Sequence, residues 1–207
     1  CVCLRTSQDN GLTFSKEIRI PKIINCLAFY VFIDTKPGTK PEEIFKAVYG
    51  VNERYGDGQW MAAASSDGLV WKDLGHIWNR AKLTRSSSFI YAFDALNTVY
   101  YDNDIGRYVA YARSVKQWSS RGVMHASTSD FMNWPNKNWQ EVEFDPPLKS
   151  GESLYLMNGL KCPLPNCPYN MGFSSLYNSH ENDDCIARGM MPHHADCEEG
   201  YQDTFFT

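Results

Sequence analysis

The 207-residue sequence lacks a long apolar run, an excess of positive charge and a recognisable leader. No stretch approaches the roughly 18 apolar residues that a membrane-spanning helix needs, so we expect no membrane partner. The formal net charge is −4, whereas nucleic-acid-binding surfaces carry clustered Lys and Arg, so we expect no nucleic-acid partner. No secretory signal is visible, but the chain starts at Cys1 without a methionine, and its localisation is therefore left unknown.

The sequence also lacks a convincing amphipathic helix. Short apolar and β-branched runs lie between clusters of Gly, Asn, Asp, Pro and Ser, a pattern typical of short strands joined by turns. One helical turn after Pro41 is an alternative, but residues 45–49 fit a strand better. The predicted strands are 27–33, 45–49, 60–64, 98–101, 108–112 and 122–126. Many short strands with regular turns predict an all-β sandwich, barrel or propeller.

The cysteine count is odd, at seven. An odd count fits either a truncated disulfide set or mostly free thiols. The spacing of Cys162 and Cys167 is at the loose edge of a zinc-ligand pair, and no second tight pair follows, so we expect no metal and no cofactor. The alternative to unpaired thiols is a disulfide, Cys162–Cys167 or Cys185–Cys197, which would indicate a secreted or extracytoplasmic protein.

Three similar segments, at residues 7–14, 65–71 and 128–134, favour the propeller among these folds. Each follows an apolar strand, contains an aspartate and ends in an aromatic residue. The aspartates recur about every 60 residues, which is in the range of one long propeller blade. We expect the aspartates to hold turn amides, Gly to take the positive-φ position and the aromatic residues to pack between neighbouring sheets. The residues assigned to structure in this way are Asp9, Asp67, Asp130, Trp71 and Trp134.

A hairpin is expected at residues 98–113. Its turn is Asp102-Asn-Asp-Ile-Gly106, because Asn and Asp tolerate left-handed backbone and Gly adopts it without steric cost. Asp94 precedes this hairpin in an aromatic and small-residue setting. It is either a strand cap or structural acid, paired with Arg85 or Arg113, or a functional carboxylate.

Together these motifs resemble glycosidase-like five-bladed β-propellers related to glycoside hydrolase families 32 and 43. The resemblance covers almost the whole chain. It is carried by the three Asp-box-like turns, residues 32–37 followed by 45–48, residues 93–97 with their hairpin, and residues 121–134. It implies an all-β propeller with a central carbohydrate pocket. Residues 1–207 would be a partial domain of about three to four blades, truncated at both ends.

The resemblance also implies a catalytic set. Glycoside hydrolysis needs two carboxyl groups, one to protonate the leaving oxygen and one to activate water or attack the sugar. Asp94 stands where these families carry the aspartate of an Arg-Asp-Pro unit, although this sequence has Phe-Asp-Ala. Glu152 is the nearest candidate for the acid of their Glu-Cys-Pro unit, and Asp203, expected to enter the next inner strand, is its rival. The predicted catalytic residues are Asp94, Asp203 and Glu152.

A second set is expected to contact a carbohydrate substrate or ligand, because aromatic faces, amides and charged groups suit sugar rings. Structural alternatives remain open: turn chemistry for Asp34, an ion pair for Arg113 and a solvated loop acid for Glu152. The leading function is glycoside hydrolysis. The alternatives are a non-catalytic carbohydrate-binding propeller, favoured by the missing Arg-Asp-Pro and Glu-Cys-Pro units, and a structural or interaction propeller. The predicted substrate-binding residues are Asp34, Arg113, Tyr155, Asn158 and His193.

Overall fold

The computed structural model describes residues 2–20, 26–51, 59–79, 89–92, 97–116, 121–135, 139–142, 152–162, 164, 167, 170–181 and 198–206. This part of the chain consists of strands and turns with one 3-10 helix, Pro41–Glu43. The prediction of an all-β fold is therefore confirmed. No helix in these ranges is long and apolar enough to cross a membrane.

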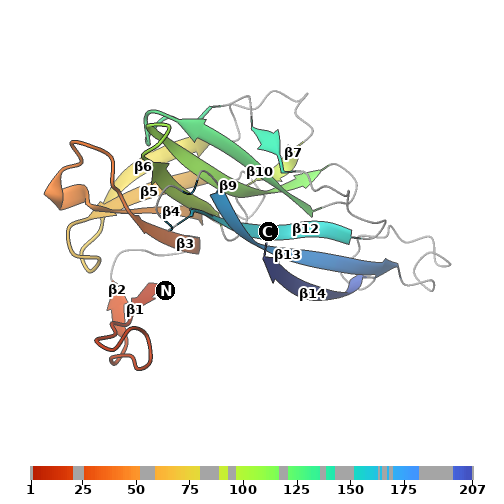
Figure 1. The fold of residues 1–207 in the computed structure, drawn as a ribbon, viewed down its shortest axis with the longest axis horizontal. Coiled ribbons are helices and arrows are strands. Elements are labelled where there is room, and N and C mark those ends of the chain that lie inside the picture. Colours follow the sequence, from red (N-terminus) through yellow and green to blue (C-terminus); the bar gives the residue numbers. More distant parts are fainter. Residues whose placement is uncertain are drawn as a thin grey trace.

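The strands form four antiparallel sheets (Figure 1). The first is a hairpin of β1 (Val2–Leu4) and β2 (Ile18–Ile20). The second contains β3 (Cys26–Ile33), β4 (Phe45–Val51), β5 (Gln59–Ser65) and β6 (Lys72–Asn79). In the third, β7 (Phe89–Ala92) and β8 (Thr98–Asp102) both pair with β9 (Arg107–Lys116), followed by β10 (Arg121–Thr128) and β11 (Gln140–Glu141). The fourth contains β12 (Glu152–Lys161), β13 (Asn170–Glu181) and β14 (Glu198–Phe206).

All six predicted strands lie within observed strands. The alternation of side chains explains why β5 is central to its sheet. Trp60 and Ala62 point into one core cluster, while Met61 and Ala63 point into a second cluster on the other face. The middle of the second sheet is therefore buried on both sides, which demands apolar residues at consecutive positions.

The second and third sheets pack face to face over the larger core cluster. Trp60 lies 5.3 Å from Trp134 and 6.1 Å from Trp139, measured between ring centroids. Trp60 is 0% exposed and Trp134 is 2% exposed. The prediction that Trp134 is a core residue is confirmed, and burial of such large rings is a main contribution to the packing of these two sheets.

The strands of the larger sheets follow one another in chain order. Because neighbouring strands are antiparallel, the connection between the first and second strands and the connection between the third and fourth strands lie at the same end of the strands in each sheet. We call this the turn edge; it includes residues 34–44, 66–71, 103–106 and 129–135. We call the other edge, where β3, β7 and β12 begin, the opposite edge. Hydrogen bonds from Lys36 to the Ser129 carbonyl and from Asn103 to Thr35 join the turn edges of the second and third sheets.

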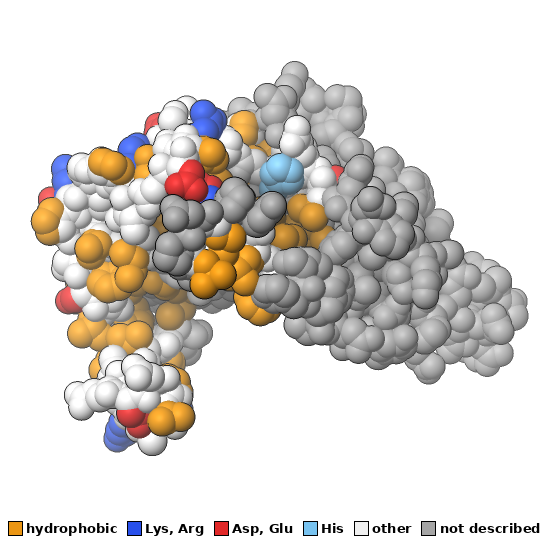
Figure 2. Space-filling model, viewed as in Figure 1, with side chains coloured by type: hydrophobic (Ala, Val, Ile, Leu, Met, Phe, Trp, Pro, Cys, Tyr) orange, Lys and Arg blue, Asp and Glu red, His pale blue; other side chains and the backbone are white. Residues whose placement is uncertain are grey.

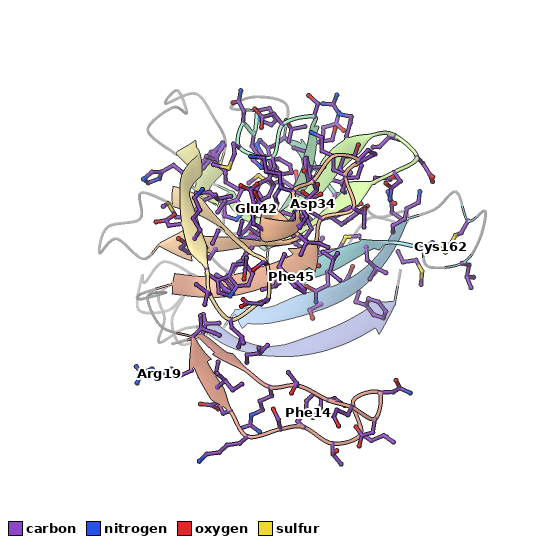
Figure 3. The ribbon with its side chains drawn as sticks, turned by 90° about the vertical axis from the view of Figure 1, so that its left-hand side faces the viewer. Phe14, Arg19, Asp34, Glu42, Phe45 and Cys162 are labelled. Atoms are coloured by element: carbon purple, nitrogen blue, oxygen red, sulfur yellow. A yellow bond between two sulfur atoms is a disulfide. The ribbon has the colours of Figure 1, made fainter. Side chains whose placement is uncertain are left out.

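The hairpin β1–β2 is set apart from the larger sheets in two perpendicular views (Figures 1 and 3). Leu12, Phe14 and Ile18 are exposed at 85%, 60% and 44%. Hydrophobic side chains are correspondingly visible at the surface of this part of the molecule (Figure 2). The prediction that the first aromatic residue packs between sheets is wrong for Phe14, because no further strand pairs with this hairpin in the described part of the chain.

Candidate functional site

The aspartates of the repeated turns hold the turn amides as predicted. Asp67 Oδ1 accepts the backbone N–H groups of Leu69 and Val70 at 2.8 and 2.9 Å. These bonds lower the pKa of the Asp67 carboxyl. Hydrogen bonds from Thr13, first from its hydroxyl and then from its backbone, lower the pKa of Asp9 to about 2. Carboxylates held in this way are structural anchors of their turns.

Glycine and tryptophan complete these turns. Gly11 and Gly68 have φ values of 88° and 74°, the left-handed region that glycine enters without strain. Trp71 packs edge-on against Phe29 at 5.1 Å, and its indole N–H donates to the Gly68 carbonyl at 2.8 Å. The half-buried Trp71 is thus held by a ring contact and a hydrogen bond, in agreement with the prediction that it is a structural residue.

A buried acid, Asp34, stands at the end of β3. Its backbone N–H donates to the Ile44 carbonyl at 2.8 Å, which closes the connection between β3 and β4. Its Oδ1 accepts the N–H of Lys36 at 3.1 Å. Its Oδ2 accepts Lys46 Nζ from β4 at 2.5 Å and the Tyr108 hydroxyl from β9 at 2.8 Å. The carboxylate therefore links the second sheet to the third.

Burial governs the electrostatics of this cluster. Asp34, Lys46 and Tyr108 are 3%, 8% and 1% exposed. Desolvation, followed by the hydrogen bond to Asp34, raises the pKa of the Tyr108 phenol, so the phenol stays neutral. The Lys46 ammonium also lies 5.1 Å from the centre of the Phe131 ring, a cation–π distance.

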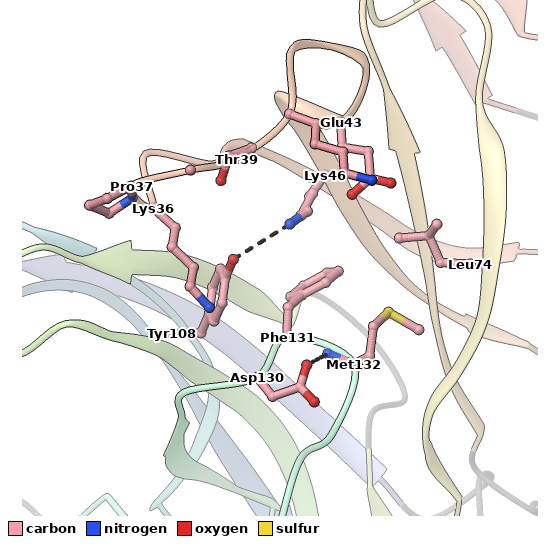
Figure 4. A pocket seen from close by; sticks show the side chains of 12 residues that line it. Lys36, Pro37, Thr39, Glu43, Lys46, Leu74, Tyr108, Asp130, Phe131 and Met132 are labelled. Atoms are coloured by element: carbon pink, nitrogen blue, oxygen red, sulfur yellow. Dashed lines mark hydrogen bonds between the residues drawn. The ribbon is translucent and has the colours of Figure 1, made fainter.

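A surface pocket of about 400 Å³ lies over this cluster at the turn edge (Figure 4). Its lining is mixed in charge: it includes Lys40, Glu43 and Asp130, and Phe131 lies between Glu43 and Asp130 (Figure 4). Asp34 itself does not line the pocket. The Asp34 side chain is 0% exposed, so a substrate could contact it only if the residues that cover it moved.

Several predicted residues lie outside the described part of the chain or on a strand where their side chains are not described. Asp94 and His193 lie outside the described residues, as do Cys185 and Cys197. Glu152 is the first residue of β12, and Tyr155 lies further along the same strand. Their roles stay predictions.

Asp203 lies on β14, paired with Leu176 of β13. The strand is the third of its sheet, reached only after β12 and β13, and the expectation that Asp203 enters an inner strand stays a prediction. The segment occupies the position of β5 and β10, the strands that lead into the aspartate turns. Its proposed catalytic role is not tested by this placement.

Asn97, directly before β8, supports the third sheet from its side chain. Ala92 of β7 pairs with Ser114, and Thr98 of β8 pairs with Tyr111. Between these pairs, the N–H of Arg113 donates to the side-chain oxygen of Asn97 at 3.0 Å. Asn97 is 0% exposed, so its amide replaces a missing backbone acceptor inside the sheet. This role of Asn97 was not predicted from the sequence. The signal available there is a polar amide directly before a β-branched strand.

The predicted Arg113 and Asn158 are both described. Arg113 is 8% exposed on β9, so its guanidinium is largely enclosed. Asn158 is half-buried on β12 and pairs with Phe173 of β13. Neither lines the pocket at the turn edge, and their substrate contacts stay predictions.

The first strands β8 and β12 lie side by side and run in the same direction. The N–H of Gly159 donates to Thr98 Oγ1 at 3.2 Å. Two residues later, Lys161 Nζ reaches Asp104 Oδ2 at 2.7 Å, just beyond the end of β8. Both strands therefore run from the opposite edge to the turn edge.

The described residues contain one disulfide, Cys162–Cys167, which confirms that alternative for this pair. The two sulfurs are therefore not available as zinc ligands. No group of three or more His, Cys, Asp and Glu side chains in the described ranges stands close enough to hold a metal ion.

No family model matches the sequence, and no curated protein sequence matches it. The structure is similar to an N-acetylgalactosamine deacetylase from F. plautii, solved in complex with blood group B trisaccharide. The two share 12% identity and a TM-score of 0.52, over 88% of this chain and 49% of that chain. A GH43_1 enzyme from Xanthomonas citri, complexed with xylotriose, aligns at 10% identity and a TM-score of 0.42, over 74% of this chain and 39% of that chain. The chain thus spans about half the length of the deacetylase, with which it shares a fold.

Proposed function

We propose that this chain is part of a glycosidase-like five-bladed β-propeller that acts on a glycan through carboxylates at the opposite edge of its sheets. The parallel course of β8 and β12 carries the proposal. Asp94 lies in the chain between β7 and β8, which both pair with β9, and Glu152 opens β12, so two neighbouring first strands carry one candidate acid each.

The arrangement of the sheets supports the propeller. Each larger sheet is a run of antiparallel strands in chain order, and β8 contacts the first strands of both neighbouring sheets, β3 and β12. Blades around a common axis bring first strands together in this way. The shared fold with a deacetylase that was solved with a trisaccharide supports a glycan ligand.

Four acids of the turn edge have structural partners. Asp67 and Asp130 hold turn amides, Asp34 is enclosed by Lys46 and Tyr108, and Asp102 accepts the N–H of Asp104 at 2.9 Å. Hydrogen bonds to a carboxylate favour its charged form and so oppose its use as a general acid. These four acids therefore favour a search for the catalytic pair at other positions.

In the proposed reaction, one carboxyl protonates the glycosidic oxygen and a second carboxylate activates water or attacks the sugar. Asp94 serves as the base or nucleophile, and Glu152 as the acid. Asp203 is a weaker partner, because its strand is separated from β12 by β13. The substrate contacts fall to Arg113, Tyr155, Asn158 and His193.

Hydrolysis of 4-nitrophenyl glycosides and of blood group B trisaccharide by the intact protein tests this proposal. Asp94→Asn should lower kcat on the order of 10²–10⁴-fold, since it removes one acid–base group while keeping the shape. The matched control is Glu42→Gln, an exposed acid in the 3-10 helix at the turn edge, which should leave kcat unchanged. Activity that survives Asp94→Asn would exclude Asp94 from catalysis.

The second candidate is a carbohydrate-binding propeller without hydrolysis. It is favoured by Phe-Asp-Ala at Asp94, where the resembling families carry Arg-Asp-Pro. Saturable binding of the same glycans without turnover, weakened by Asp94→Asn, would support this candidate. If the intact protein neither hydrolyses nor binds these glycans, both candidate functions are contradicted.

A further inference from the structure

A second and larger pocket, of about 690 Å³, opens at the turn edge where three sheets meet. Thr35 comes from the end of β3, Tyr100 and Tyr101 from β8, Asn103 from the following turn, and Lys161 from the end of β12. The volume is within the range of small-molecule sites. None of these residues belongs to the catalytic set proposed above.

The walls of this pocket are tied to one another. Asn103 Nδ2 donates to Thr35 Oγ1 at 3.1 Å, which joins the second and third sheets. Lys161 Nζ lies 2.7 Å from Asp104 Oδ2, which joins the third and fourth. The disulfide Cys162–Cys167 fixes the rim beside Lys161 (Figure 3). A pocket built before the ligand arrives loses less conformational entropy on binding.

The lining presents aromatic and apolar surface to solvent. Tyr101 is held edge-on against Tyr108 at 5.0 Å between ring centroids, so its ring has a fixed orientation. Ile33 and Leu164, also in the lining, are exposed at 59% and 68%. Large exposed apolar side chains gathered around a pocket are typical of binding sites.

The polar groups of the lining indicate an uncharged ligand rich in hydroxyls. Among the lining residues the charged groups are the Asp104 carboxylate and the Lys161 ammonium, which pair with each other, so the lining has no excess of positive charge for an anion. Their remaining lone pairs and protons, with the Asn103 amide and the Thr35 hydroxyl, can accept from and donate to hydroxyl groups. An apolar face beside such groups matches a sugar ring.

We propose that this pocket is a binding site for neutral carbohydrate units, distinct from the glycan site at the opposite edge. Tyr100, Tyr101, Ile33 and Leu164 contact the C–H face of the sugar, and Asn103 and Asp104 bind its hydroxyls. The site does not depend on hydrolysis, so it stands or fails separately from the proposed function.

The test is ligand-observed saturation-transfer NMR on the intact protein with methyl β-D-galactopyranoside, methyl β-D-glucopyranoside and methyl β-D-xylopyranoside. We expect saturable binding of at least one glycoside. Asn103→Ala and Asp104→Ala should each weaken it about tenfold, the value of a hydrogen bond to a hydroxyl in a formed pocket. Both residues are exposed turn positions, so the variants should keep the melting temperature near that of the parent.

Two controls separate this site from its neighbours. Glu42→Gln alters an acid of the turn edge outside the lining and should leave the binding unchanged. Asp94→Asn alters the proposed glycan site and should leave the part of the binding that the pocket variants remove. Leu164→Ser is a third pocket variant. It removes an exposed apolar side chain of the rim and should weaken binding without a change in any strand. No binding by any of the glycosides, binding unaffected by all three pocket variants, or binding abolished by Asp94→Asn would each overturn the proposal.

Discussion

Two acid–lysine pairs mark the ends of successive first strands, and they differ in how far water reaches them. Asp34 follows β3 and pairs with Lys46, with side chains 0% and 10% exposed. Asp102 ends β8 and lies 3.6 Å from Lys161, with side chains 3% and 28% exposed. Lys161 also pairs with Asp104, whose side chain is 65% exposed. The first pair is enclosed and the second is open to solvent on one side.

The two pairs also show one principle of construction. At each pair, the acid at the end of a first strand also contacts a long side chain from the next sheet. Tyr108 of the third sheet reaches Asp34 of the second, and Lys161 of the fourth reaches Asp102 of the third. The acids at the turn edge thus join sheets. Loss of Lys46 removes the ammonium at 2.5 Å from the enclosed Asp34, whereas the closer partner of Lys161 is the exposed Asp104, which water can solvate.

The largest expected effect follows from removing the lysine of the enclosed joint. Lys46→Met leaves the Asp34 carboxylate buried without its ammonium partner, and should lower the free energy of unfolding by about 3–5 kcal/mol. Denaturant unfolding of the intact protein measures this loss.

The control for this change removes both charges. Asp34→Leu combined with Lys46→Met should recover a large part of the lost stability, because it replaces the buried pair by apolar side chains of similar size. A loss smaller than about 1 kcal/mol for Lys46→Met alone, as for an exposed pair, would mean that the joint is more open than the structure indicates.

An intermediate effect is expected from Tyr108→Phe, which removes one hydroxyl and keeps the ring in the core. The lost hydrogen bond goes to a charged acceptor, so the cost should be about 2 kcal/mol. Denaturant unfolding near neutral pH gives this value, and the parent protein is the reference.

The same tyrosine predicts a pH dependence. Burial and Asp34 raise the Tyr108 pKa above its ordinary value of 10.0, so above that pH the unfolded chain releases the phenolic proton while the folded chain retains it. Stability should therefore be full below pH 10 and fall as the pH rises further. Tyr108→Phe should reduce this alkaline loss. An unchanged alkaline slope in the variant would exclude Tyr108 as its source.

The sequence was sufficient for those features that local patterning determines. The strands followed from apolar alternation, and the Asp67 turn from the Ser-Ser-Asp-Gly run, whose carboxylate contacts amides two and three residues away. Trp134 was expected in the core because it ends such a turn. The same rule was wrong for Phe14, since packing depends on which sheet lies beside the hairpin, and local sequence does not contain that information.

The candidate site depended on contacts between distant residues, which the sequence alone does not reveal. Asp34 was an acid before a Pro-Gly turn, and its partner Tyr108 lies 74 residues away. Asn97 was not recognised, because its role arises only from the break between β7 and β8. Gly159 is similar: a Cβ there would lie 2.2 Å from the Tyr111 ring, a constraint created by the approach of β12 to β9.

The smallest effect is expected at the open joint. Lys161→Met removes the ion pairs with Asp104 and Asp102, but water can solvate the Asp104 carboxylate, and Asp102 loses only the longer contact of 3.6 Å and keeps its hydrogen bond from the Asp104 N–H, so the melting temperature should fall only slightly. About 1 M NaCl, which shortens the Debye length to about 3 Å, should shrink even this difference, whereas the loss caused by Lys46→Met should persist in salt because its partner is buried. Melting curves of both variants at low and high salt make the comparison. If Lys161→Met destabilised as much as Lys46→Met, or did so independently of salt, the two joints would be equally enclosed, and the pocket bordered by Lys161 would be less accessible to a ligand than proposed.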